Sequence, residues 1–381
     1  MDFGDCKNLR IVWGNNCIDR NAQLFGRLGK YALIVTGKNS ARKSGALADV
    51  INALERNSVR YKLFEEVVEN PTLSVAEGIG EAARKFGADF LVGIGGGSAL
   101  DATRAGSIFA VNKFRKSSDV YKCEFEETLP FVCGGTTAGT GSEVDSIAII
   151  SEDGGKKRSI KNAKLYAWFS FCDPKYTLSL SYRQTVSTAL DAFCHCLESW
   201  FSKASTEESR EYAAQGAALI YPNLVKLVGD RYILYNKRLR EELYYGSLWG
   251  GLAIDIAGTG FPHPCGYVLT ETCGVPHGIA TAVFENAFLR HSLNELPEER
   301  DRLFETIGAG EKDIYDTITA LTKNNIRISK ELCDEIGERL KTAPATERTL
   351  GEFSWEEGKQ LAEIRFLDRR LLEKFSGRWT L

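Results

Sequence analysis

The stretch ADFLVGIGGGSALD, residues 88–101, decides the fold class of this chain. Residues 88–94 are predominantly apolar, which is typical of a strand buried inside a parallel sheet. The glycines that follow lead into a helical pattern over residues 102–110. A buried strand, a glycine-rich turn and a helix in this order predict an α/β unit with a crossover helix.

Strand and helix patterns alternate on both sides of this stretch, from about residue 10 to residue 175. Residues 31–36 (YALIVT) have the composition of a buried strand, and residues 45–54 have apolar positions at helical spacing. After Pro174, long helical patterns follow without a clear strand between them. We therefore predict a Rossmann-like parallel sheet with helices over residues 1–180 and an all-helical domain over residues 181–381.

Composition places the chain among ordinary globular proteins. Hydrophobic residues make up 43% and charged residues 26% of its 381 residues, and the formal net charge is -3. Basic residues are scattered, so we expect no nucleic-acid partner. No segment is apolar enough to span a membrane, and the first ten residues do not form a secretory signal. The 10 cysteines show no C-x-x-C spacing, which favours a reduced, cytoplasmic protein.

Two glycine-rich turns follow predicted strands. The first offers Gly95, Gly96, Gly97 and Ser98 at a helix N-terminus, where unpaired N–H groups and the absence of side chains suit a pyrophosphate. The second, residues 134–143, adds the hydroxyls of Thr136, Thr137, Thr140 and Ser142. Either turn alone is also explained as a structural strand-to-helix or helix-capping loop. Together they favour one extended ligand at the carboxyl edge of the sheet.

The chain has only four histidines, and three of them are candidate metal ligands. Asp191 precedes His195 by four residues, so on a helix both side chains leave the same face. With His263 and His277 they would form a one-acid, three-histidine site suited to Fe(II) or Zn(II). Each candidate also has a structural interpretation. Asp191 and His195 could be an ordinary intrahelical pair, His263 a loop residue and His277 a turn residue. Cys273, four residues before His277, is a competing ligand, whereas Cys194 and Cys196 point away from the face of His195.

The motifs together resemble the iron-containing (group III) alcohol dehydrogenase family. They match in order and spacing across most of the chain: Asn70-Pro71-Thr72, GGGSALD at 95–101, TTAGTGSE at 136–143, Asp173-Pro174, Asp191 with His195 and Glu198, and the span from GTGFPH at 258–263 to PHG at 276–278.

The resemblance implies a dehydroquinate synthase-like architecture, an active site between the two domains and a homodimer. It implies that Asp191, His195, His263 and His277 hold a divalent ion, usually Fe(II) and sometimes Zn(II). The cofactor contacts that we predict are Gly37, Lys38, Asn70, Gly95, Gly96, Gly97, Ser98, Asp101, Thr136, Thr137, Thr140, Ser142 and Lys157.

Two positions depart from the family pattern. Tyr267 stands where many members have a further histidine, so Tyr267 or a water chain is the expected proton route. Arg104 stands where lysine is frequent, and we expect the exchange to be tolerated on a helix that needs only positive charge. Family members that prefer NAD often have an acid after the strand at residues 31–36. Here Gly37 and Lys38 follow instead, and the absence of the acid favours NADP.

We predict a metal-dependent alcohol dehydrogenase or aldehyde reductase that transfers hydride between NAD(P) and a small primary alcohol or aldehyde. The ion would polarise the substrate oxygen. Three alternatives stay open: glycerol dehydrogenase-like oxidation of polyols, a dehydroquinate synthase-like lyase that uses NAD transiently, and a non-catalytic scaffold that retains the fold.

Overall fold

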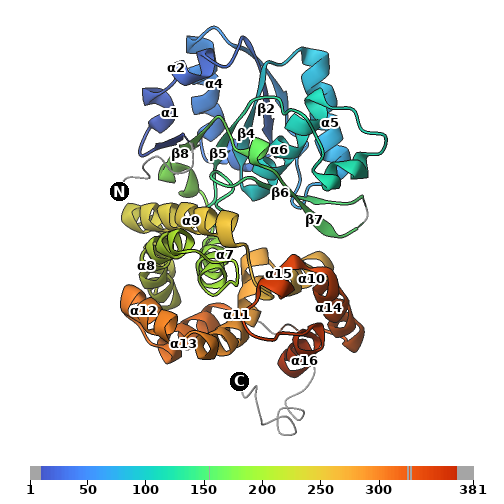
Figure 1. Ribbon diagram of the computed structural model, residues 1–381. Helices are drawn as coiled ribbons and strands as arrows, with labels where there is room; N and C mark the ends of the chain where they lie inside the picture. Colours follow the sequence, from blue (N-terminus) through green and yellow to red (C-terminus); the bar gives the residue numbers. More distant parts are fainter. Residues whose placement is uncertain (1–9, 154, 324–325, 327, 367–381) are drawn as a thin grey trace. The chain divides into compact units, whose positions relative to one another are not determined.

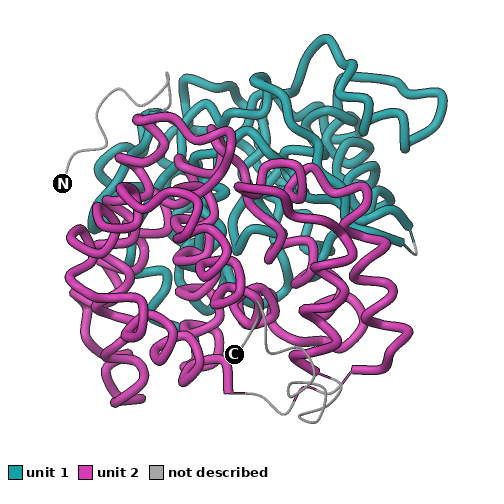
Figure 2. Tube along the Cα trace, turned by 60° about the horizontal axis from the view of Figure 1, so that its bottom comes forward, with its two compact units in different colours: residues 1–180 teal, residues 181–381 magenta. Residues whose placement is uncertain are grey.

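The chain divides into two compact units, residues 1–180 and 181–381, coloured separately in Figure 2. The computed structural model describes residues 10–153, 155–323, 326 and 328–366. The dinucleotide-binding role predicted for the first unit and the metal-binding role predicted for the second stay predictions at this level.

A six-stranded sheet forms the centre of the first unit, and every pairing in it is parallel. The strand order is β1-β8-β5-β4-β2-β3. The strands are β1 (Ile11–Trp13), β2 (Tyr31–Thr36), β3 (Arg60–Phe64), β4 (Phe90–Gly95), β5 (Phe131–Gly135) and β8 (Phe169–Cys172). The predicted α/β class is confirmed, and the strand expected at residues 31–36 forms with those bounds.

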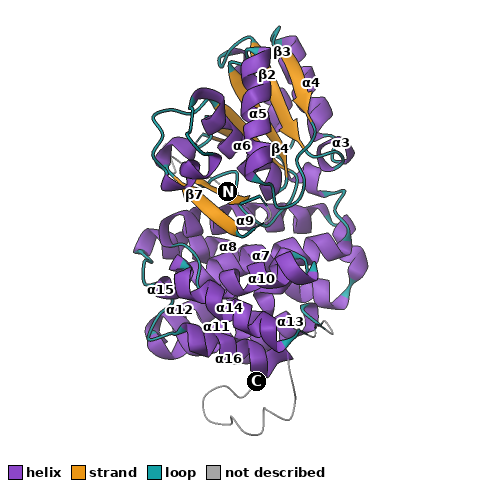
Figure 3. Cartoon of the chain, turned by 90° about the vertical axis from the view of Figure 1, so that its right-hand side faces the viewer, coloured by secondary structure: helices purple, strands orange, loops and turns teal. Residues whose placement is uncertain are grey.

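Helices cover both faces of this sheet (Figure 3). Successive side chains of a strand point to opposite faces. Accordingly, Ala32 and Ile34 of β2 pack in one apolar cluster with α4, and Leu33 and Val35 pack in another with α5 and α6. The helices of this unit are α1 (Cys17–Arg20), α2 (Gln23–Gly26), α3 (Ser40–Lys43), α4 (Ala46–Arg56), α5 (Leu73–Phe86) and α6 (Gly97–Val111).

A separate antiparallel hairpin stands beside the main sheet. It consists of β6 (Ile147–Ser151) and β7 (Lys157–Lys161). The amide of Ser151 donates to the carbonyl oxygen of Pro71 at 2.9 Å, which ties the hairpin to the loop before α5. Short 3-10 turns at Ser117–Lys122, Ala163–Leu165 and Pro174–Thr177 complete the unit.

Helices alone make up the regular structure in the described part of the second unit, as predicted (Figure 1). They are α7 (Tyr182–Trp200), α8 (Glu207–Gly229), α9 (Lys237–Ala257), α10 (Pro262–Cys273), α11 (His277–Glu295), α12 (Pro297–Ile307), α13 (Glu311–Leu321), α14 (Lys330–Thr342), α15 (Pro344–Arg348) and α16 (Trp355–Phe366), with a 3-10 turn at Arg231–Tyr235. Within the described ranges, no helix combines the length and apolar character needed to cross a lipid bilayer.

Candidate metal centre and cofactor edge

Helix α7 carries Asp191 and His195 on one buried face. The helix starts at a capping box, in which the amide of Gln184 donates to Ser181 Oγ at 3.3 Å and the amide of Ser181 donates to Gln184 Oε1 at 3.0 Å. Ten residues later, Asp191 and His195 are 4% and 5% exposed. A polar pair buried this deeply costs free energy unless it binds something, so an ordinary surface pair does not explain it.

His263 and His277 reach the same carboxylate from two other helices. His263 is the second residue of α10 and His277 is the first residue of α11. The distance from Asp191 Oδ1 to Nε2 is 4.0 Å for His195, 3.8 Å for His263 and 3.6 Å for His277. The structure therefore brings together all four residues that the sequence predicts as ligands, and His263 lies in a helix rather than in a loop.

The donor set fits a divalent ion. Ligands about 2.1 Å from a tetrahedral metal lie about 3.4 Å apart, close to the distances around Asp191 Oδ1. The ligand atoms of Asp191, His195 and His263 all lie within 4.8 Å of one another, and His277 is placed beside this group by its 3.6 Å distance to Asp191 Oδ1. Asp191 Oδ1 is buried and has no hydrogen bond from any described residue. One carboxylate oxygen and three imidazole nitrogens are ligands that both Fe(II) and Zn(II) accept.

A glycine allows α11 to approach α7 closely at this point. A Cβ atom on Gly278 would lie 1.8 Å from the carbonyl oxygen of Ser187 and 2.8 Å from Asp191 Cβ. No side chain fits there, so only glycine lets His277, its chain neighbour, reach the carboxylate. The sequence Pro276-His277-Gly278 thus places a ligand and also removes the obstacle to it.

Glu198 positions His263 and was absent from the predicted site. Its Oε1 lies 2.6 Å from His263 Nδ1, and its Oε2 accepts the amide of Gly260 at 2.8 Å. A carboxylate on Nδ1 leaves Nε2 to face a metal and fixes the orientation of the ring. The sequence spacing could have indicated Glu198, because Asp191, His195 and Glu198 follow the i, i+4, i+7 spacing of one helix face.

Behind Glu198 lies a second buried acid, Glu285 of α11. Atoms of Glu198, Glu285 and Cys194 all lie within 4.8 Å of one another, and both carboxyl groups are 0% exposed. Burial raises the pKa of Glu198 and of Glu285 well above the ordinary value; the charge of Asp191 adds to the rise at Glu198, and the charge of Glu198 adds to the rise at Glu285. Two charged carboxylates at this separation repel, which favours the protonated form of Glu285.

Tyr267 lies against two of the candidate ligands. Its ring stacks on His277 with centroids 5.0 Å apart and meets His263 edge-on at 6.3 Å. It therefore occupies the neighbourhood in which the sequence places a proton route. Cys273, the competing ligand, is exposed, and the metal-binding groups found among the described residues do not include it.

The two glycine-rich turns of the first unit meet at one edge of the sheet. Strands β4 and β5 are neighbours, with Gly95 paired to Gly135, and the amide of Thr136 donates to the carbonyl oxygen of Gly95 at 2.8 Å. A Cβ atom on Gly96 would lie 3.1 Å from Thr137, and one on Gly97 would lie 2.7 Å from Thr140. The glycines thus leave backbone amides accessible between threonine side chains, a cradle that suits a phosphate.

Two further predicted contacts lie beside this cradle. The amide of Asn70 donates to Ser98 Oγ at 3.4 Å, and Asn70 has a φ of 56°, which asparagine tolerates better than most residues. Lys157 begins β7 and pairs with Ser151 of β6. The amide of Ser151 donates to the carbonyl oxygen of Pro71, the residue that follows Asn70. The structure therefore brings Asn70, Ser98 and the β6–β7 hairpin to one place.

Asp101 and Ser142 point into the protein. Ser142 Oγ donates to Asp101 Oδ1 at 3.1 Å, and the amide of Ile149 donates to Asp101 Oδ2 at 3.1 Å. Arg104 is fully buried and donates to the carbonyl oxygens of Ser142, of Asp145 at 2.9 Å and of Leu165 at 3.0 Å. The expectation that position 104 needs only positive charge is therefore wrong, because the guanidinium joins two backbone segments, residues 142–145 and the turn at Leu165.

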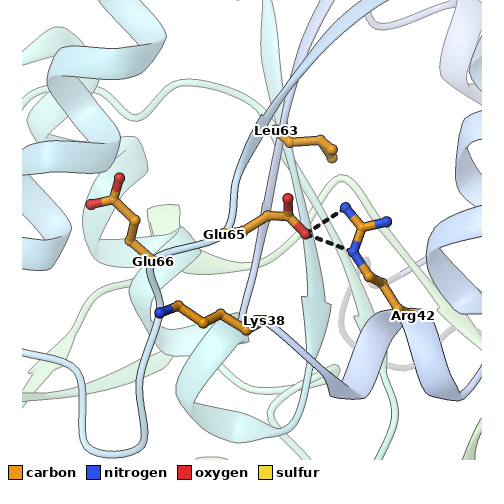
Figure 4. A pocket seen from close by; sticks show the side chains of 5 residues that line it. All are labelled: Lys38, Arg42, Leu63, Glu65 and Glu66. Atoms are coloured by element: carbon orange, nitrogen blue, oxygen red, sulfur yellow. Dashed lines mark hydrogen bonds and ion pairs between the residues drawn. The ribbon is translucent and has the colours of Figure 1, made fainter.

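Gly37 and Lys38 follow β2 at some distance from the cradle along the chain. Lys38 lines an open pocket of about 510 Å³ with Arg42, Leu63, Glu65 and Glu66. Figure 4 shows the Arg42 guanidinium facing Glu65, with Nε and Nη2 at 2.9 and 2.8 Å from Oε1. The pocket thus contains both basic and acidic side chains.

Comparisons with known proteins identify the family. Residues 8–174 match the family model described as iron-containing alcohol dehydrogenase, and residues 185–339 match its C-terminal counterpart. The sulfoacetaldehyde reductase of Bilophila wadsworthia is 31% identical over 277 residues, 71% of this chain and 70% of that protein. The 1,3-propanediol dehydrogenase of Citrobacter freundii is 31% identical over 313 residues, 79% of this chain and 76% of that protein. A solved iron-containing alcohol dehydrogenase from Thermotoga maritima superposes with a TM-score of 0.86 at 30% identity and covers 94% of this chain and 98% of its own.

Proposed function

This chain belongs to the iron-containing alcohol dehydrogenase family, and from that premise we propose that it interconverts a small primary alcohol and its aldehyde with NAD(P) and one divalent ion. A single observation carries the proposal: three imidazole Nε2 atoms lie 3.6–4.0 Å from one buried oxygen of Asp191. Such a set has no structural need in a helical core unless it binds an ion.

When bound, the ion supplies Lewis-acid polarisation of the substrate oxygen, and the nicotinamide supplies hydride exchange. The chain's own residues bind and orient. Asp191 contributes the negative charge that offsets the cation, and Glu198 keeps His263 Nδ1 occupied so that Nε2 faces inward. The near absence of exposed surface on Asp191 and His195 excludes water, which strengthens electrostatic interactions there.

The hydroxyl of Tyr267 is our candidate for moving the proton between the substrate and solvent. Its ring is held against His277, the most exposed of the four candidate ligands, with 24% of its side chain accessible. A proton that leaves the site would pass this side. Tyr267→Phe removes the hydroxyl and keeps the ring, so we expect a lower kcat with unchanged metal content if the hydroxyl carries the proton.

NADP is the slightly favoured cofactor in this proposal. Gly37 follows β2 in place of an acid that would repel a 2'-phosphate, and Lys38 and Arg42 line the adjacent pocket. Glu65 already pairs with Arg42, so a 2'-phosphate would compete with it. The ratio of kcat/KM for NADPH and NADH measures the outcome directly, and Gly37→Asp should shift that ratio toward NADH.

The test combines metal analysis of anaerobically purified protein with NADPH and NADH oxidation across short aldehydes. We expect about one Fe(II) or Zn(II) per chain and oxidation of the nicotinamide. A metal-loaded protein that leaves nicotinamide absorbance unchanged with every alcohol and aldehyde would instead be a lyase of the dehydroquinate synthase type. A preference for glycerol over simple alcohols would identify the polyol alternative. Activity that survives Asp191→Ala unchanged would contradict the proposed site.

A further inference from the structure

Arg348 is a cation beside the candidate metal centre that the reaction described above does not use. It ends α15 and is half-buried. Its Nε donates to the carbonyl oxygen of Thr259 at 3.3 Å. Among the described residues, neither of its two Nη atoms has a hydrogen bond or a salt bridge. Arginine stays charged in proteins, so partly desolvated Nη atoms without hydrogen-bond acceptors are unfavourable.

The segment before His263 connects Arg348 to the metal centre. Thr259 accepts from Arg348, the amide of Gly260 donates to Glu198, and the amide of Phe261 donates to Thr349 Oγ1 at 3.2 Å. The end of α15 is therefore bound to the same few residues that lead into α10 and its histidine. Arg348 belongs to the surroundings of the site and not to a remote surface.

The guanidinium lies against Gly258 and Thr259, within electrostatic reach of Glu198 and Tyr267. Burial lowers the pKa of Arg348, and the charges of Glu198, Tyr267 and Glu347 oppose this shift, so these three groups lie within electrostatic reach. No carboxylate of the described residues is within 4 Å of its nitrogens. A Cβ atom on Gly258, whose φ is 67°, would lie 2.5 Å from Arg348 Nε. The glycine leaves the room that the guanidinium occupies.

We propose that Arg348 binds the anionic end of the substrate, so that the aldehydes this chain prefers carry a carboxylate or sulfonate group a few bonds from the carbonyl. This inference rests on the proposed function and specifies its substrate class. Guanidinium groups recognise both anions through parallel N–H donors, and the two Nη atoms offer these donors. The aldehyde end would lie toward Tyr267 and the histidines, and the anion would accept hydrogen bonds from the two Nη atoms of Arg348.

The competing explanation is structural, because Arg348 also lies within electrostatic reach of Glu198 and Glu347. A cation that only balances these acids would affect every substrate equally. Substrates of matched length separate the two explanations: succinic semialdehyde against butanal, and sulfoacetaldehyde against propanal. Activity with the neutral aldehydes tests the proposed reaction. The ratio of kcat/KM for a charged aldehyde to kcat/KM for its neutral partner tests the role of Arg348.

With the metal-loaded enzyme, we expect kcat/KM to be at least about tenfold higher for each charged aldehyde than for its neutral partner. Arg348→Gln should lower kcat/KM for the charged aldehydes about 10–100-fold, mainly through KM, and leave the neutral ones within about threefold. Arg348→Lys should restore part of the preference. Equal losses for both classes, or the absence of any preference in the wild type, would overturn the proposal.

Gly258→Ala provides a second variant that leaves the arginine in the sequence. The added methyl group would displace the guanidinium, so the charged aldehydes should lose more kcat/KM than the neutral ones. Gly308→Ala is the matched control, because Gly308 has a φ of 68° and nothing within 4 Å of its Cβ position. It shares the positive φ without touching Arg348, although its ψ is 32° where that of Gly258 is -168°, and it should keep the wild-type ratio.

Binding distinguishes failure of this inference from failure of the proposed function. If no aldehyde is reduced, the proposed function fails, and calorimetric titration of butyrate and propane-1-sulfonate still tests Arg348. The anions should bind the wild type and bind Arg348→Gln at least about tenfold more weakly. Equal binding to both proteins, or no binding to the wild type, would remove Arg348 as an anion site.

Discussion

The candidate metal centre and the glycine-rich edge solve opposite problems. The metal centre gathers side chains, because Asp191 and three histidines from three helices approach one point. The glycine-rich edge removes side chains, because Gly96 and Gly97 keep space between their amides and two threonines. A metal needs lone pairs that only side chains bring close enough, whereas a pyrophosphate is bound by backbone N–H groups.

The difference teaches how substitutions will act in each region. In the metal centre, removing one ligand deletes a function that no neighbour replaces. At the glycine-rich edge, adding a small group obstructs a surface whose other amides remain. The effects should therefore be large in the first region and graded in the second.

The largest effect is expected for Asp191→Ala. Loss of the carboxylate leaves three imidazoles without the negative charge that offsets the cation, so the metal content should fall from about one per chain to near zero. Activity should fall by about 10³-fold or more. Metal analysis and kcat/KM on the same sample measure both. His291→Gln is the control, because His291 Nε2 bonds the carbonyl oxygen of Leu350 instead, and metal retention there is required for the comparison to hold.

Glu198→Gln tests whether the metal centre depends on residues beyond its ligands. The amide is neutral and holds His263 less firmly, so metal affinity should weaken about 10–100-fold while the four ligands stay in place. Competition with a chelator gives the affinity. Unchanged affinity would mean that Glu198 only fills the core behind His263.

At the glycine-rich edge, the buried side chain of Asp101 affects the stability of the fold. Burial raises the pKa of Asp101 from 3.8 to about 6, against the opposing charge of Arg104. Because the folded-state pKa lies above the unfolded one, this carboxyl contributes stability that is fully present below about pH 4 and is lost as the pH rises through about 6.

The difference in unfolding free energy between the wild type and Asp101→Asn should therefore change by about 2–3 kcal/mol across that window. Denaturant unfolding at a series of pH values measures it. Asp19→Asn, at an exposed position, is the matched control. A constant difference from pH 4 to pH 7 would show that Asp101 does not titrate in this range.

The smallest effect is expected for Gly97→Ala. The new methyl group would lie 2.7 Å from Thr140 and push it toward the phosphate position, so nucleotide affinity should fall about tenfold. Fluorescence titration with NADPH and NADH measures the loss. Gly229→Ala adds the same methyl group where nothing lies within 4 Å, and it should bind the nucleotide normally. Equal binding by both variants would remove the first turn from the cofactor site.

Local features of this protein were predictable from sequence. The strand at residues 31–36, the helix pattern of α7 and the turn after β4 each depend on neighbours in the chain, and periodicity or glycine content reveals them. Asp191 and His195 belong to this class, because helical spacing alone puts them on one face. The family motifs added His263 and His277 by resemblance.

What the tertiary structure decided is the meeting of residues from separate elements. The packing of α10 and α11 against α7 sets Glu198 on His263, Glu285 behind Glu198 and Tyr267 on His277. It also turns Arg104 into a buried link between backbone segments and sets Arg348 beside Thr259. Sequence spacing fixes direction only within one helix or strand, whereas these contacts depend on the distances and angles at which helices pack, which many side chains determine jointly.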